Sequence, residues 1–154
     1  MCDGEQNFRW EFIKSEALLR YMKGTKADWY VIHAPTKSHT GLHVQSTVKC
    51  SHLSSQLNKK NLYFEFDDEN GIGTLQDLAA KALAGSGWTL GICDTFFERD
   101  GTTEKVRSMK TSSKRGSYLL IQDLCKMFSA YPVYDADDKT VSLYSLSARE
   151  GYLE

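Results

Sequence analysis

Three histidines and a cysteine form the densest set of side chains that could bind a metal ion. The set comprises His39, His43, Cys50 and His52. Zinc needs about four nitrogen or sulfur ligands that converge tetrahedrally. His39 and His43 would share one face of a helix, but Gly41 and the alternating apolar residues over 42–48 predict a strand. A strand leaves His43 and His52 far apart unless a turn brings the chain back, so we interpret the histidines as polar residues of a strand and a loop.

An acidic run at residues 67–71, Asp-Asp-Glu-Asn-Gly, offers oxygen ligands of the kind that calcium binds. A calcium loop of the EF-hand type has a ligand at its first position and a glycine at its sixth. Counting back from Gly71 puts Phe66 first, and a phenyl ring cannot bind the ion. The Gly71-x-Gly73 pattern also falls short of a dinucleotide-binding turn, because the third glycine is missing and three acids would repel phosphate. We predict a solvated turn that precedes a helix.

A group of basic residues between positions 105 and 115 could meet phosphate groups. The group comprises Lys105, Arg107, Lys110, Lys114 and Arg115. It lacks the interleaved aromatic residues on which bases stack, and the net charge of −1 gives no global attraction to nucleic acid or anionic membranes. We therefore predict a solvated strand edge, where lysines discourage pairing with other chains, and no nucleic-acid partner.

Sequence motifs of known catalytic and nucleotide-binding sites are absent: the chain contains no GxSxG, HExxH, GxxxxGKS, GxxxxGKT or GxGxxG. The cysteines are widely spread and form no CxxC pair; they are Cys2, Cys50, Cys93 and Cys125. We interpret them as reduced and mainly as small buried hydrophobic residues. We assign no catalytic, cofactor-binding or metal-binding residue, and we predict that the protein is not an enzyme.

The bulk composition is that of an ordinary globular chain, with 154 residues, 41% hydrophobic and 25% charged. No apolar run approaches the roughly 18 residues that a membrane span needs. The first ten residues lack the basic start and the apolar stretch of a signal peptide. We expect a soluble chain that does not insert into membranes.

Residues 1–66 are predicted to form a β-rich segment that could belong to a larger domain. Alternation of apolar and polar residues predicts strands at residues 8–12, 29–33, 42–48 and 62–66. Ala34-Pro35 is expected to end the second of these strands. A short helix is predicted over residues 15–23, where Glu16 and Arg20 have i,i+4 spacing. Residues 51–60 are predicted to be a short helix or a turn.

Residues 67–154 are predicted to form an α+β subdomain with two helix-strand units. The first helix begins after Thr74, a good N-cap, and its apolar stripe comprises Leu75, Leu78, Ala79, Ala82 and Leu83. The second lies within residues 118–128, and its stripe comprises Ile121, Leu124, Cys125 and Phe128. Strands are predicted at residues 88–92, 104–111, 131–134 and 140–146. The order of elements over the later part is β-α-β-β-α-β-β, which predicts an α+β fold of mixed sheets with two amphipathic helices packed on them.

Two local patterns carry a resemblance to a known family. One is a helix followed by Gly85-Ser86-Gly87-Trp88-Thr89-Leu90-Gly91, and the other is a helix and hairpin ending in Lys139-Thr140-Val141-Ser142-Leu143. With these patterns, residues 41–146 resemble the N-terminal structural region of phage and prophage minor tail proteins. These are also described as tail-associated or baseplate hub proteins of siphophages.

The resemblance implies a non-catalytic subunit of a ring at the tail tip, commonly a trimer, that joins the tail tube to the host-recognition apparatus. Its partners would be other copies of the chain and other tail proteins, in a virion made in the cytoplasm of the bacterial host. Full-length members are usually longer, so we expect this chain to be an internal fragment. Two alternatives stay open: a fragment of a tail-associated peptidoglycan hydrolase, and a metal- or carbohydrate-binding module that uses His39, His43 and His52.

Overall fold

The computed structural model describes residues 13–40, 43–58 and 63–146, and the chain divides into two compact units, Met1–Leu53 and Ser54–Glu154. The sequence placed this boundary between residues 66 and 67. Residues 54–66 belong to unit 2 instead, because strand β4 (Tyr63–Phe64) pairs with strand β8 (Arg115–Gly116).

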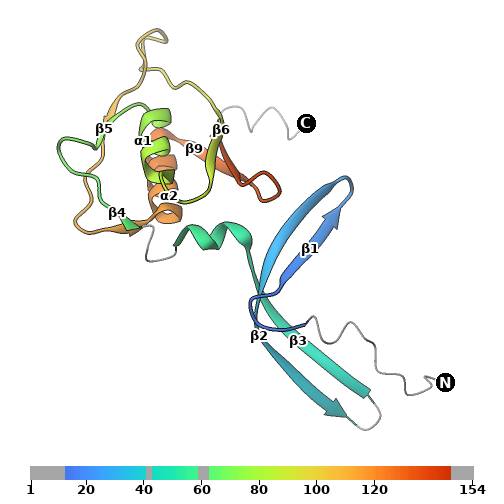
Figure 1. Ribbon diagram of the computed structural model, residues 1–154. Helices are drawn as coiled ribbons and strands as arrows, with labels where there is room; N and C mark the ends of the chain where they lie inside the picture. Colours follow the sequence, from blue (N-terminus) through green and yellow to red (C-terminus); the bar gives the residue numbers. More distant parts are fainter. Residues whose placement is uncertain (1–12, 41–42, 59–62, 147–154) are drawn as a thin grey trace. The chain divides into compact units, whose positions relative to one another are not determined.

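Unit 1 contains a three-stranded antiparallel sheet in the order β1-β2-β3 (Figure 1). Its strands are β1 (Leu18–Lys23), β2 (Lys26–Thr40) and β3 (His43–His52). β1 pairs with the N-terminal part of β2, with Leu18 opposite Val31. β3 runs back along β2 and ends with His52 opposite Tyr30. The middle strand is therefore β2, and β1 and β3 are the two edges.

The prediction of a helix over residues 15–23 is wrong. Glu16 adopts a positive φ of 67°, which interrupts the helical spacing between Glu16 and Arg20, and the following residues form strand β1. Backbone pairing with β2 satisfies the hydrogen-bonding groups of β1 that face β2. Such tertiary pairing routinely overrides a weak local preference for helix.

The predicted end of the second strand at Ala34-Pro35 is also wrong, because β2 continues to Thr40. The register with β3 is irregular between His33 and Thr36. An irregularity of this kind accommodates a proline, which has no N–H to donate to the ladder. The strand predicted over residues 42–48 is confirmed for residues 43–48, which lie in β3, whereas the one over residues 8–12 lies outside the described residues.

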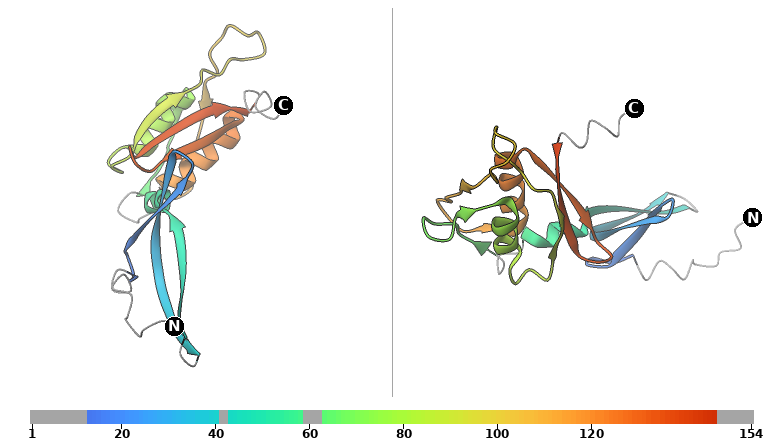
Figure 2. Two further views of the ribbon diagram at one scale, coloured as in Figure 1. Left: turned by 90° about the vertical axis from the view of Figure 1, so that its right-hand side faces the viewer. Right: turned by 90° about the horizontal axis from the view of Figure 1, so that it is seen from above.

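Unit 2 consists of two helices that cover one face of a sheet (Figure 2). The helices are α1 (Leu75–Leu83) and α2 (Ser117–Phe128), and the sheet has the order β6-β10-β9. These strands are β6 (Thr89–Cys93), β9 (Ala130–Asp135) and β10 (Thr140–Ser145). β10 pairs parallel with β6 and antiparallel with β9, so the sheet is mixed. The fold is α+β, as predicted.

The predicted order of elements recurs in unit 2, with two additional two-residue strands. The strand predicted over residues 104–111 is shorter than expected and comprises only Arg107–Ser108. β5 (Ile72–Gly73) pairs with β7 (Arg107–Ser108), and β8 pairs with β4. Of the strand predicted over residues 62–66, the described part is strand at Tyr63–Phe64 and ends there. Phe66 stays buried, and its backbone N–H and carbonyl both bond to Thr111 at 3.0 Å. A short 3-10 helix, η2 (Leu53–Asn58), confirms the short helix or turn predicted over residues 51–60.

The core of unit 2 lies between the two helices and the sheet. Its fully buried large side chains are Leu57, Phe66, Leu78, Leu120, Ile121, Leu124, Phe128, Val141 and Leu143. Both predicted apolar stripes are buried, which confirms them. The stripes orient the helices because burying one leucine or phenylalanine side chain contributes about 1.5–3 kcal/mol.

The two helices begin in different ways. The Thr74 hydroxyl accepts a hydrogen bond from the Asp77 N–H, and the Asp77 carboxylate accepts one from the Thr74 N–H. This reciprocal cap confirms the predicted N-cap of α1. α2 begins after Gly116, which has no side chain to cap it.

We expect Thr74→Ala to lower the free energy of unfolding of unit 2 by about 1 kcal/mol, because the N-terminal amides of α1 lose their acceptor. Thr74→Ser keeps the hydroxyl and serves as the control. Urea unfolding followed by circular dichroism at the helical band measures the difference, because α1 and α2 both lie in unit 2. Equal urea midpoints for the two variants would show that the cap contributes nothing.

Candidate functional site

The potential zinc set is divided between the two ends of a strand. His43 is the first residue of β3 and His52 is the last. At about 3.3 Å per residue, the strand separates them by roughly 30 Å, so these two histidines cannot ligate the same ion. Among the residues that the structure describes, no three His, Cys, Asp or Glu side chains are grouped to hold a metal.

The histidines near the middle of the unit 1 sheet instead contact their neighbours. His33 Nε2 lies 2.6 Å from Ser51 Oγ on the adjacent strand. His52 Nε2 lies 3.7 Å from Asp28 Oδ1, and its ring meets the Tyr30 ring edge-on with centroids 5.6 Å apart. These side chains bridge neighbouring strands.

The acidic run is closed by its own hydrogen bonds. The Asp67 carboxylate accepts from the backbone N–H groups of Asn70 and Glu69, and these bonds lower the pKa of Asp67. The Gly71 N–H donates to the Asp67 carbonyl. A Cβ at Gly71 would lie 2.0 Å from the Met109 carbonyl oxygen, so the glycine is required by close packing. The predicted turn before a helix is confirmed.

Four of the basic residues between positions 105 and 115 have partners within unit 2. The Arg107 guanidinium donates to both carboxylate oxygens of Glu98. Lys110 pairs with Asp68 at 2.6 Å, Arg115 pairs with Asp123 at 2.7 Å, and Lys105 lies over the Phe128 ring at 5.7 Å. The pairing neutralises most of the positive charge that the sequence suggested. A continuous phosphate-binding strip does not form from these residues.

The cysteines occupy three different environments. Cys125 is buried on α2 as predicted, Cys93 is half-buried on β6, and Cys50 is exposed on β3. The prediction of a buried residue is therefore wrong for Cys50, whereas Cys2 lies outside the described residues. Burial raises the pKa of the Cys93 thiol to about 11 and that of Cys125 to about 12. Both thiols stay protonated at neutral pH and are poor nucleophiles.

Exposed apolar side chains of unit 1 identify the first candidate interaction surface. We call Leu18, Arg20 and Met22 the β1 face, because alternate residues of a strand project to the same side. Leu18 is 54% exposed and Met22 is 50% exposed. Arg20 lies between them, and its guanidinium stands 5.6 Å from the centroid of the Trp29 ring. The β1 face is thus an apolar surface with one positive charge at its centre.

The opposite side of the same sheet is also apolar. Leu19 is 41% exposed and Tyr21 is 54% exposed, and together with Tyr30 and Cys50 they line a shallow hollow. A sheet in a monomeric protein usually buries at least one face. Both sides of the unit 1 sheet instead present large apolar side chains to solvent.

The segment between β6 and β7 carries the second candidate surface (Figure 1). Phe97 forms a bridge opposite Glu104, and the Lys105 N–H donates to the Phe96 carbonyl, so the segment is a hairpin. Exposure alternates from residue 104 to 108, as in an extended strand. We call Phe97, Glu104 and Val106 the hairpin face. Phe97 is 50% exposed and Val106 is 47% exposed.

The other side of this hairpin is attached to the core of unit 2. Phe96 meets Phe128 edge-on with ring centroids 6.1 Å apart, and Lys105 lies over the same ring. Near the tip, the Asp100 carboxylate accepts from the N–H groups of Thr102 and Thr103 and from the Thr103 hydroxyl, which lowers the pKa of Asp100 to about 2. Contacts with Phe128 therefore order the base of the hairpin, and the hydrogen bonds of Asp100 order its tip.

Comparison with known proteins found no family model that matches the chain and no match among curated proteins. In the described parts of the chain, no helix is long and apolar enough to cross a membrane. The functional assignment therefore depends on the surfaces of the two units and on the resemblance stated above.

Sequence reasoning missed both candidate surfaces for a specific reason. The helix expected over residues 15–23 would place Arg20 on the opposite side from Leu18 and Met22, so the three would not form one face. Residues 95–103 contain no pattern that predicts a strand, so the sequence alone indicates a loop there. The alternation of Glu104, Val106 and Ser108 with Lys105 and Arg107 was visible in the sequence, but the partner strand was not.

We expect the exposure of Cys50 to give one fast-reacting thiol in the folded chain. In a Cys2→Ser variant, a thiol reagent should modify one cysteine quickly under native conditions and all three after denaturation, because Cys93 and Cys125 are shielded and protonated. Adding Cys50→Ser should remove the fast phase. A fast phase that survives this second substitution would contradict the described burial of Cys93 and Cys125.

Proposed function

We propose that the protein is a non-catalytic structural component of a bacteriophage or prophage tail tip, which acts in virion assembly and host attachment. It works by associating with further copies of itself, as a trimer in the arrangement that the resemblance implies, and with other tail proteins. The chain is made in the cytoplasm of the bacterial host and resides in the virion.

One observation carries the proposal: the unit 1 sheet exposes large apolar side chains on both of its sides. Leu18 and Met22 are half-exposed on one side, and Leu19 and Tyr21 on the other. Contiguous exposed apolar surface is uncommon on monomeric proteins and marks sites of interaction. A subunit that is covered by its neighbours has a use for such a sheet, whereas an isolated domain does not.

The residues behind the resemblance have structural tasks in unit 2, which supports a scaffold role. Gly87 adopts a φ of 76°, and Trp88 is 5% exposed and meets Tyr134 edge-on at 6.2 Å. Val141 and Leu143 lie fully buried on β10, the middle strand of the sheet. The two patterns thus form a helix-strand connection and the central strand.

We expect the purified chain to self-associate to a defined multiple of its 17.4 kDa mass, three times that mass for a trimer. Sedimentation equilibrium over a wide concentration range measures the mass, and the same protein should show no clearing in a zymogram on bacterial cell walls. A strict monomer at every concentration would contradict assembly through self-association. Clearing of the cell walls would instead support the alternative of a peptidoglycan hydrolase fragment.

A further inference from the structure

We propose that the β1 face of one copy docks on the hairpin face of a second copy, with Arg20 against Glu104 at the centre of the contact. This inference rests on the proposed self-association and names the two surfaces that produce it. The occupant of each surface is therefore another copy of this chain.

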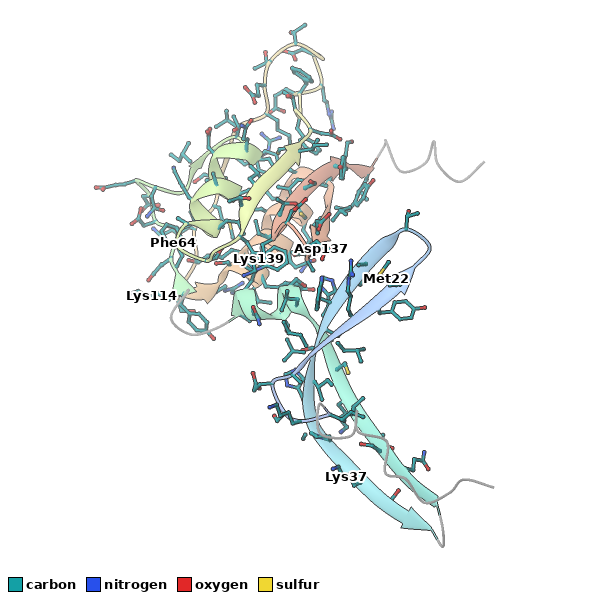
Figure 3. The ribbon with its side chains drawn as sticks, turned by 45° about the vertical axis from the view of Figure 1, so that its right-hand side comes forward. Met22, Lys37, Phe64, Lys114, Asp137 and Lys139 are labelled. Carbon is teal, nitrogen blue, oxygen red and sulfur yellow. The ribbon has the colours of Figure 1, made fainter. Side chains whose placement is uncertain are left out.

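Each of the two faces combines one charge with two exposed apolar side chains, and the two charges have opposite sign. Arg20 is exposed and flanked along β1 by Leu18 and Met22, at about 6.6–7 Å for alternate residues of a strand. Met22 stands near the turn at the end of the β1–β2 hairpin (Figure 3). The guanidinium lies over an aromatic ring, which holds it on this side of the sheet.

Glu104 is the matching negative charge on the hairpin face. Phe97 lies directly across the hairpin from it, and Val106 lies two residues along the chain on the same side. Among the described residues, neither Arg20 nor Glu104 is in an ion pair, although Arg107, Lys110 and Arg115 are each matched with a carboxylate. Two unpaired opposite charges, each surrounded by exposed apolar side chains, are suited to pair across an interface.

The hairpin face is held in shape before a partner arrives. The Glu98–Arg107 pair, the contacts of Phe96 and Lys105 with Phe128, and the Asp100 turn fix the opposite side and the tip. A surface that is already ordered loses little conformational entropy on binding. An ordered hairpin face suits a partner that also has a fixed shape, such as strand β1, which is paired with β2.

Two copies could meet through identical faces or through different faces, and the signs of the charges decide between these two arrangements. Pairing the β1 face with itself would bring Arg20 close to its own counterpart, and pairing the hairpin face with itself would do the same with Glu104. Like charges at the centre of an apolar contact are costly. The favourable contact joins two different surfaces. A contact of that kind repeats from copy to copy, and it gives a ring when the rotation between copies closes and a filament when it does not.

Charge reversal tests this contact. In sedimentation velocity, Arg20→Glu and Glu104→Arg should each weaken self-association by roughly tenfold or more, because each places like charges in the contact. The double variant Arg20→Glu/Glu104→Arg should restore association to within about threefold of the unaltered chain, because the pair is re-formed with the charges exchanged. Lys114→Glu, an exposed reversal outside both faces, should leave association unchanged.

The outcomes separate this inference from the proposed function. If the unaltered chain assembles but the single reversals change nothing, or if the double variant stays dissociated, the copies meet through other surfaces and only the inference is overturned. If the unaltered chain is monomeric throughout, the proposed self-association itself is contradicted. Circular dichroism of each variant shows whether it is folded.

A cross-linking measurement gives an independent answer if a charge variant fails to fold. Arg20→Cys and Glu104→Cys are introduced together into a chain that also carries Cys2→Ser and Cys50→Ser. Mild oxidation should then give a ladder of multiples of 17.4 kDa on a non-reducing gel. Chains with only one of the two new cysteines are the control and should give no species larger than a dimer. The absence of a ladder from assembled protein would overturn the contact.

Discussion

The burial of β10 under two helices is the constraint on which unit 2 depends. Val141 and Leu143 are completely buried, and the helices place Leu78, Leu120 and Leu124 over this face of the sheet. Because β10 pairs with both β6 and β9, its burial fixes the sheet and the two helix-strand units together. Phe128 extends the same core to Phe96 and so determines where the exposed hairpin stands.

Unit 1 has no comparable layer among its described residues. Its three strands bury Val31 and Ile32 in the middle strand, while the edge strand β1 leaves Leu18, Leu19 and Tyr21 about half-exposed. Isolated small sheets are marginally stable in water, since backbone pairing alone does not offset the entropy of ordering the strands. The stability of such a sheet increases when a neighbouring surface covers its apolar side chains. Assembly and folding of this unit are therefore expected to be coupled.

Local signals predicted unit 2 well and unit 1 poorly. The helix α1 could be derived from Thr74, Asp77 and a regular apolar stripe, because capping and amphipathic spacing act within a few residues. Residues 15–23 failed because their partner lies in β2, and the pairing across Pro35 depends on an irregularity that no local pattern indicates. The candidate surfaces were missed for the same reason. A row of exposed residues is defined only when the register of both strands is known, and register is a non-local property.

The net charge of −1 bears on how copies of such a chain can approach one another. A strongly charged subunit would repel its own copies, and association would then have to overcome that repulsion at every contact. A nearly neutral chain has no such barrier, so a few local charges can decide which surfaces meet. Half of the charged groups of unit 2 between residues 98 and 123 are in ion pairs, namely Glu98, Arg107, Lys110, Arg115 and Asp123. Arg20 and Glu104 are in no ion pair among the described residues, and they lie beside exposed apolar side chains on two different units. That placement favours a contact with a defined direction, which is the property a ring of identical subunits needs.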